Sequence, residues 1–366
     1  MPDAARSPAV ALLVDSLNAR ARRSRHPERL VRGLSARGWQ AEVVPVTAGM
    51  LGLLPRDGAG DAAQGPEQVE RADVLLAYDT ASPAAWLGAR LARRLGKPLV
   101  LVEPAWFSLR SWHERARERT GRAMWGRIVR NEARAVVCLD PVAVERVRSY
   151  GYREEDTHLV VPPVDTDEFR PGVPSRVVSR LHVTGRFVLC VGHLEHGRGL
   201  DVLVRAFGRT VGQGGDWSLV LAGSGSLETR LEALAYRVGA AGTVRIVALP
   251  PQEELPGLFA GATLFCAPSE DDRVRGRNLS HAIAAGLPCI ASDLPRLRLR
   301  VEHERNGLIV QPDDEQALAS ALKRACGGPE VRRRWAAESR RIAVERFSIP
   351  AVAARYDEIL RPLLES

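Results

Sequence analysis

Strand-length apolar runs alternate with helical patterns along almost the whole sequence, and this alternation restricts the chain to few folds. In the first half, runs such as Val10–Val14, Val74–Ala77 and Pro98–Val102 are separated by helical segments that include Pro27–Arg37 and Ala84–Leu95. Continuous apolar runs are typical of strands in a parallel sheet, where helices cover both faces. The sequence therefore predicts an α/β fold.

The same alternation restarts near Arg186, which indicates a second domain of the same kind. The segment between the two halves, Val161–Pro174, contains four prolines and is typical of a domain linker. A chain of 366 residues is long enough for two domains of ordinary size. We therefore expect two doubly wound, Rossmann-like domains that face each other across a cleft.

Two strand-to-helix transitions in the second half combine glycines with polar or basic side chains. The run FVLCVGHLEHGRGLD, residues 187–201, places His193 and Arg198 in such a loop, and LVLAGSGSL, residues 219–227, repeats the pattern without the basic residues. Backbone amides beside a guanidinium suit a pyrophosphate group. A tight turn explains short glycine motifs equally well, so these loops alone leave both interpretations open.

A third segment, PSEDDRVRGRNLSHAIAAGLPCIASD, reads as an acidic turn, a helix, a stop and a buried strand. Leu279, Ala282 and Ile283 share one face of the helix, and Pro288 prevents its continuation. A loop that leads into a helix at the edge of a parallel sheet is a common place to bind anionic groups. The segment is therefore a candidate anion site.

Taken in order, these segments resemble the family-4 retaining glycosyltransferases of GT-B fold. The resemblance runs from about Val10 to Leu360 and also includes PQEELPGLFAGATLFCAPSE, RNGLIVQPDDEQALASAL and VERFSIPAVAARYDEIL. It implies an N-terminal acceptor-side domain at 1–170 and a nucleotide-sugar-binding domain at 171–345. It also implies a C-terminal helical segment, 346–366, that returns to the N-terminal domain.

The resemblance implies transfer of a hexosyl group, with retention at the anomeric carbon, from a UDP- or GDP-type sugar to a sugar, lipid-linked or small-molecule acceptor. No metal or further cofactor is expected. Negative charge that develops on the departing diphosphate needs positive charge beside it. The family's Arg and Lys positions read His193 and Arg198 here. With Asp272 near the sugar, these are the expected catalytic residues. The expected donor-binding residues are Gly192, Gly199, Gly223, Gly225, Glu270, Gly276, Arg277 and His281.

Several positions depart from the family pattern at the donor site. The two glutamates of the family's E-x7-E motif correspond to Arg273 and His281, although a one-residue insertion would give Asp272 the first role. The usual Gly-Gly pair is replaced by Pro295-Arg296. His281 is expected either to contact the ribose or to lie on a solvated helix face. The alternative function is a catalytically impaired binding or scaffolding protein on the same fold.

The basic composition is spread along the chain rather than concentrated in one motif. The net charge is +8, and Lys97 and Lys323 are the only lysines among 52 basic residues. No basic module with interleaved aromatic residues is visible, so we expect no nucleic-acid partner.

The segment 106–134 combines many arginines with apolar residues and allows two interpretations. It could be an amphipathic helix that lies on a membrane. The favoured interpretation is a surface helix whose apolar residues Trp125, Ile128 and Val129 cover the N-terminal sheet. The sequence start lacks a basic region before its apolar run, and the five cysteines lack metal-site spacing. We therefore expect a cytoplasmic protein, with peripheral contact at the inner membrane face as the open alternative.

Overall fold

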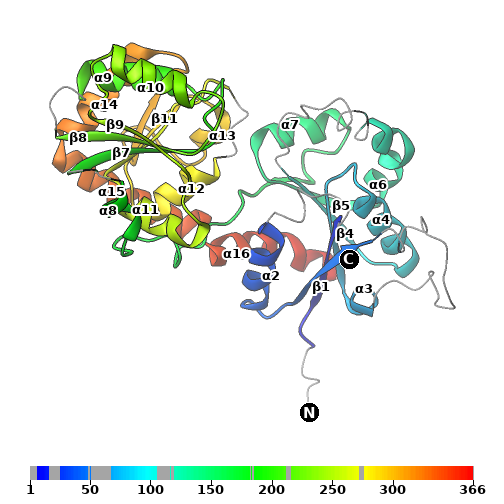
Figure 1. Cartoon of the computed structure of the whole chain (residues 1–366). Helices are drawn as coiled ribbons and strands as arrows, with labels where there is room; N and C mark the ends of the chain where they lie inside the picture. Colours follow the sequence, from blue (N-terminus) through cyan, green and yellow to red (C-terminus); the bar gives the residue numbers. More distant parts are fainter. Residues whose placement is uncertain are drawn as a thin grey trace. The chain divides into compact units, whose positions relative to one another are not determined.

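The chain contains two parallel six-stranded sheets, each covered by helices (Figure 1). The computed structural model describes residues 6–15, 25–47, 50, 67–104, 116, 119–181, 183, 185–211, 216–271 and 276–365. It divides into two compact units, Met1–Pro163 with Ile349–Ser366, and Val164–Ser348. The predicted α/β class with two Rossmann-like sheets is confirmed.

The first unit has strand order β2-β1-β3-β4-β5-β6, with every pair parallel. Its strands are β1 (Ala9–Asp15), β2 (Gln40–Val46), β3 (Val74–Tyr78), β4 (Leu99–Glu103), β5 (Ala133–Cys138) and β6 (Thr157–Leu159). Its helices are α2 (His26–Ser35), α3 (Glu67–Arg71), α4 (Pro83–Leu95), a π-helical turn η1 (Arg122–Gly126), α6 (Arg127–Glu132), α7 (Pro141–Ser149), α16 (Ile349–Leu360) and a closing turn η4 (Arg361–Leu364).

Alternate residues of β1 enter two different cores, as expected for a sheet that is buried on both faces. Ala11 and Leu13 pack in a cluster with residues of α4 and α7. Leu12 and its neighbours of the same parity pack with residues of α2 and α16. Since successive side chains of a strand point to opposite faces, both sides of the sheet require apolar residues. This is why the strand contains no polar alternation.

Helix α16 belongs to the first unit although it is the last long helix of the chain. Trp39 Nε1 donates a hydrogen bond to Asp357 Oδ1 at 2.6 Å, and Arg37 Nη2 donates to Oδ2 at 3.0 Å. Burial alone would raise the pKa of Asp357, but these bonds and that from Arg361 lower it. The carboxylate is therefore charged at neutral pH and ties α16 to the segment after α2.

The second unit has strand order β12-β11-β10-β7-β8-β9, again with parallel pairs. Its strands are β7 (Arg186–Val191), β8 (Trp217–Ala222), β9 (Val244–Val247), β10 (Leu264–Ala267), β11 (Cys289–Ser292) and β12 (Gly307–Val310). Its helices are α8 (Arg176–Arg180), α9 (Leu200–Thr210), α10 (Glu228–Arg237), a 3-10 turn η2 (Gln252–Glu254), α11 (Leu255–Gly261), α12 (Arg277–Ala284), α13 (Pro295–Arg298), α14 (Glu315–Gly327), α15 (Pro329–Ile342) and a π-helical turn η3 (Ala343–Phe347).

The first strand of this unit, β7, lies between β10 and β8. The chain adds β8 and β9 on one side of β7, and then β10, β11 and β12 on its other side. Loops that follow the carboxyl ends of such neighbouring strands diverge, and ligands of open α/β sheets bind in the resulting crevice. The order of the strands therefore directs attention to the segments after β7, β8 and β10.

The segment 119–132 forms a helix with a π-helical turn, and its apolar residues do not all face inward. Val129 is fully buried and Trp125 is half-buried, as predicted for a helix that covers the sheet. The prediction for Ile128 is wrong, because 42% of this residue is exposed. The π-helical turn at Arg122–Gly126 shifts the helical phase, which the sequence periodicity does not reveal.

No helix in the described part of the chain is both long and apolar enough to cross a membrane. All five cysteines are unpaired and buried. Burial raises the pKa of each thiol, which agrees with the predicted packing role.

His26 makes the stability of the first unit depend on pH. Its ring is buried, with Nδ1 2.7 Å from Tyr78 Oη, and burial and then the charge of Arg29 lower its pKa from 6.5 to about 3. Between these values the unfolded chain binds a proton that the folded chain does not, so stability falls as the pH drops from 6.5 towards 3. We expect about 2 kcal/mol of this loss between about pH 7 and pH 5.

Urea unfolding of His26→Gln at these two pH values tests this expectation. The variant should lose less unfolding free energy on acidification than the unmodified chain, whereas His193→Gln, at an exposed histidine, should not differ from it. An equal acid loss in His26→Gln would contradict the assignment.

Candidate functional site

Three loops meet at the carboxyl edge of β10, β7 and β8. The loop at 192–199 follows β7, that at 223–227 follows β8, and 268–271 follows β10. Leu194 N donates to Ser224 O at 2.9 Å, and Glu270 N donates to Gly197 O at 3.2 Å. These backbone bonds hold the three loops together independently of any side chain.

The predicted donor-binding glycines allow these loops to approach one another closely. A Cβ on Gly223 would lie 1.8 Å from Gly192 O, and one on Gly225 would lie 2.3 Å from Leu194 O. A Cβ on Gly199 would lie 1.8 Å from Pro268 O. Each contact is far inside van der Waals distance, so backbone packing is enough to require glycine at Gly199, Gly223 and Gly225.

Arg198 carries a partly exposed guanidinium beside these loops. No described residue forms a hydrogen bond or ion pair with it. Its charge opposes the rise in the pKa of the Cys190 thiol, which burial raises to about 12, so the guanidinium lies near the carboxyl end of β7. His193 is exposed in the same loop and also has no partner among the described residues. Both side chains are accessible to a ligand.

Helix α12 begins at the same edge of the sheet and has no side-chain cap. Its N-cap residue Gly276 adopts a left-handed conformation with φ of 65°. Asn278 Nδ2 donates to Val191 O at 2.8 Å and so fastens the first turn of the helix to β7. Arg277 is exposed at the first helical position. The first amides of the helix are thus fixed next to the three loops.

A buried arginine that the sequence interpretation missed supports this helix start. Arg300 is 4% exposed, and its Nε donates to Ser280 Oγ at 2.6 Å. Its Nη1 donates to Arg296 O at 2.8 Å and would lie 2.8 Å from a Cβ on Gly276. A cation beside a helix N-terminus adds to the positive potential of the helix dipole. The N-terminus of α12 is therefore more favourable to an anion than its own amides alone would make it.

His281 lies in an aromatic cluster rather than on the surface. It is 7% exposed, and its ring stacks on Phe169 with centroids 3.9 Å apart and an angle of 5° between the planes. Phe259 meets the ring edge-on at 5.7 Å. The expected alternative of a solvated helix face is wrong, because these rings cover the imidazole. The assignment of His281 to the ribose stays a prediction.

The structure brings Gly192, His193, Arg198, Gly199, Gly223, Gly225, Glu270, Gly276, Arg277 and His281 into the second unit around this edge. Asp272, the predicted catalytic carboxylate, and Arg273 lie outside the described residues. Glu270 is exposed, and Arg296, in place of the expected glycine, is 5% exposed.

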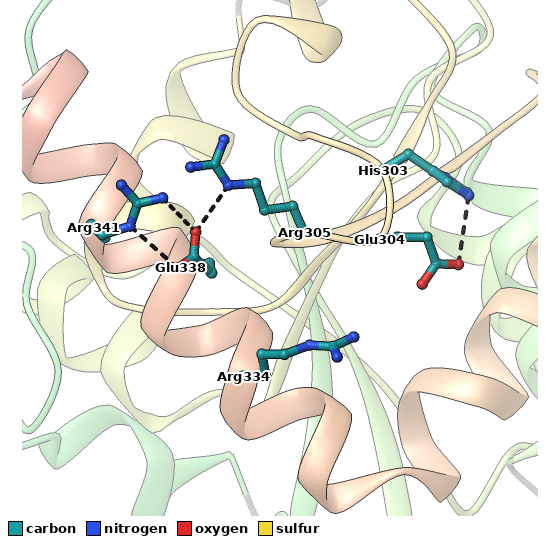
Figure 2. A pocket seen from close by; sticks show the side chains of 6 residues that line it. All are labelled: His303, Glu304, Arg305, Arg334, Glu338 and Arg341. Carbon is teal, nitrogen blue, oxygen red and sulfur yellow. Dashed lines mark hydrogen bonds and ion pairs between the residues drawn. The ribbon is translucent and has the colours of Figure 1, made fainter.

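Two of the depressions in this unit differ in their relation to the loops. One of about 270 Å³ is lined by Gly199, Glu270 and neighbouring residues of the loops, together with Arg230 and Asp313. The other, of about 590 Å³, is lined by His303, Glu304, Arg305, Arg334, Glu338 and Arg341 (Figure 2). Figure 2 shows Glu338 shared between Arg305, at 3.0 Å, and Arg341, at 2.7 Å. Because these charges largely neutralise each other, we do not propose a ligand site in the second depression.

Comparison with known proteins agrees with this geometry. Residues 64–168 match the model of Glycosyltransferase Family 4, and residues 175–342 match that of Glycosyl transferases group 1. The D-inositol 3-phosphate glycosyltransferase of Acidothermus cellulolyticus is 30% identical over 349 residues, which cover 85% of this chain and 73% of that protein. The chain belongs to the group 1, family 4 glycosyltransferases.

Solved structures of this fold agree in architecture. Anabaena HepE in complex with UDP superposes with a TM-score of 0.72 and 17% identity, covering 97% of this chain and 100% of that one. The GT-B fold is thus shared over nearly the whole chain.

Other sequence relatives are matched only in part: an exopolysaccharide phosphotransferase of Streptomyces coelicolor is 25% identical over 227 residues, which are 62% of this chain and 24% of that protein.

In a glycosyltransferase the arrangement around β7 can oppose negative charge. Backbone amides at a helix N-terminus and a free guanidinium both stabilise an anion that forms beside them. No group of three or more potential metal ligands is present among the described residues. Arg198 and the start of α12 are therefore the described groups best suited to a phosphate.

Proposed function

We propose that this glycosyltransferase moves a hexosyl group from a nucleotide-diphosphate sugar to an acceptor, with retention at the anomeric carbon and without a bound metal. One observation carries the proposal. Arg198, whose guanidinium has no partner among the described residues, stands at the edge where three loops join, two of which contain glycines, and where α12 begins without a side-chain cap.

The proposed roles follow from the charge that changes during transfer. When the bond between the anomeric carbon and the diphosphate breaks, negative charge grows on the leaving oxygen. Arg198 would stabilise this oxygen with charge-assisted hydrogen bonds, and His193 would add one donor. The amides after Gly276 would bind the diphosphate at the helix N-terminus. Glu270 or Asp272 would accept hydrogen bonds from sugar hydroxyl groups.

The nucleotide is proposed to be of the UDP or GDP type. Structures of HepE are described as complexes with UDP and with UDP-glucose, which makes uridine nucleotides the first to test on this chain. The acceptor is proposed to be a sugar, a lipid-linked sugar or a small molecule, since the relatives include a glycosyltransferase named for D-inositol 3-phosphate.

Calorimetric titration with UDP, GDP, UMP and GMP tests the donor site. We expect one of the two diphosphates to bind, and the corresponding monophosphate to bind at least about tenfold more weakly, because it lacks the second phosphate that Arg198 and the α12 amides would hold. Absence of binding by every nucleotide diphosphate, with the chain folded as judged by circular dichroism, would refute the proposal. The anomeric configuration of the product, read by NMR, then tests retention.

One observation favours the alternative of a catalytically impaired binding protein. The position of the family's second glutamate is filled by His281, and the stacking on Phe169 accounts for that side chain without a ligand. A chain that binds UDP or GDP but neither transfers nor slowly hydrolyses any matching nucleotide sugar would support this alternative.

A further inference from the structure

The helix at residues 119–132 presents exposed apolar side chains beside α4. Gly121 fits against the start of α4, since a Cβ there would lie 2.4 Å from Ala81 O. Trp125 faces Trp86 of α4 with ring centroids 6.3 Å apart. With this side of the helix buried, Met124 and Ile128 point outward and are 66% and 42% exposed. Large apolar side chains one turn apart on a surface are a candidate contact site.

Basic residues predominate in the segment that carries these two residues. Within residues 119–134, arginines are present at five positions and Glu132 is the only acid. Glu132 lies 3.7 Å from Arg93 of α4, so its charge is partly compensated. Arg127 is exposed between Met124 and Ile128, and Arg90 lies over the Trp86 ring at 4.9 Å. We call the set Trp86, Arg90, Met124, Trp125, Arg127 and Ile128 the tryptophan–arginine surface.

We propose that the tryptophan–arginine surface binds the face of an anionic phospholipid bilayer. Exposed Met124 and Ile128 would enter the boundary between headgroups and acyl chains, while the arginines contact lipid phosphates. Trp86 and Trp125 would support these two side chains from within the protein, since their rings pack together and the Nε1 atom of Trp125 is buried. A partner protein surface would need a matching apolar face and acidic residues, whereas the bilayer supplies both without further structure.

Nucleic acid is the competing anion, and the aromatic geometry disfavours it. Binding of single strands depends on open aromatic faces on which bases stack. Here Arg90 occupies a face of Trp86, and Trp125 is packed against Trp86. The exposed apolar groups are aliphatic or thioether side chains, which insert into lipid better than they stack on bases.

Co-sedimentation of the full chain with lipid vesicles tests the proposal. The chain should bind vesicles that contain about one-third phosphatidylglycerol and should bind vesicles of pure phosphatidylcholine much more weakly. Arg127→Glu, and separately Met124→Glu with Ile128→Glu, should weaken binding by roughly tenfold or more. Val344→Glu is the matched control, because Val344 is also 42% exposed but lies in the second unit. About 0.5 M salt should release the bound chain.

Three results would overturn the proposal: equal binding to neutral vesicles, unchanged binding by both variants, or binding to single-stranded RNA without binding to lipid. Circular dichroism checks that the variants fold, and the lipid and salt comparisons on the unmodified chain stand even if a variant does not. The inference is independent of the proposed donor site. Titration with UDP or GDP should give the same affinity for Met124→Glu with Ile128→Glu as for the unmodified chain.

Discussion

Replacing Arg198 with alanine should lower kcat/KM for sugar transfer by about 10²–10³-fold, the usual effect of removing one charged donor from a developing anion. The guanidinium has no partner among the described residues, so its removal orphans none of these residues and should change stability little. Steady-state kinetics with the nucleotide sugar identified by titration would measure the loss. Arg198→Lys should recover part of the activity, since it keeps the charge but not the planar fork of donors.

Arg237→Ala is the matched control for this variant. Arg237 is exposed at the end of α10, in the same unit, and has no partner among the described residues. Its replacement should leave both activity and nucleotide affinity unchanged. If the chain is a binding protein without turnover, Arg198→Ala should still weaken UDP or GDP binding by about tenfold. Unchanged activity and unchanged affinity together would exclude Arg198 from the donor site.

The fold could be predicted from the sequence because its pattern is local. Each strand of the second unit is a short apolar run, and each crossover helix has its own periodicity, so a parallel sheet with helices on both faces could be predicted, whereas the order of its strands was not. The same locality explains the error at Ile128. A π-helical turn changes the helical phase by about one residue, and no periodicity argument detects such an insertion.

The candidate site was predicted less completely because its decisive contacts join distant segments. The glycine motifs were visible, but their need for glycine arises from the carbonyl groups of Gly192, Leu194 and Pro268, which the turn pattern does not contain. Arg300 offered no motif at all, although a basic residue in the turn after the short helix α13 is a weak signal. For His281 the stacking partner, Phe169, lies in the proline-rich linker, so its burial could not be inferred from helical periodicity.

Replacing Gly199 with alanine should destabilise the second unit by about 3 kcal/mol. The new Cβ would lie 1.8 Å from Pro268 O, a backbone atom that cannot rotate away, and the φ of 63° strains any residue with a side chain. Overpacking of this kind costs about 1–3 kcal/mol, and the left-handed conformation adds about 1 kcal/mol. Thermal unfolding followed by circular dichroism would measure the change.

Gly242→Ala separates this effect from the general cost of replacing a glycine. A Cβ on Gly242 would meet no atom within 4 Å, so its substitution should change stability by less than about 0.5 kcal/mol. Because the contact between Gly199 and Pro268 joins the loop that carries Arg198 to the loop that carries Glu270, Gly199→Ala should also weaken nucleotide binding at temperatures where the variant is still folded. If Gly199→Ala has native stability, the two loops can separate at little cost. The close packing of their backbones would then not explain the position of Arg198 at this edge of the sheet.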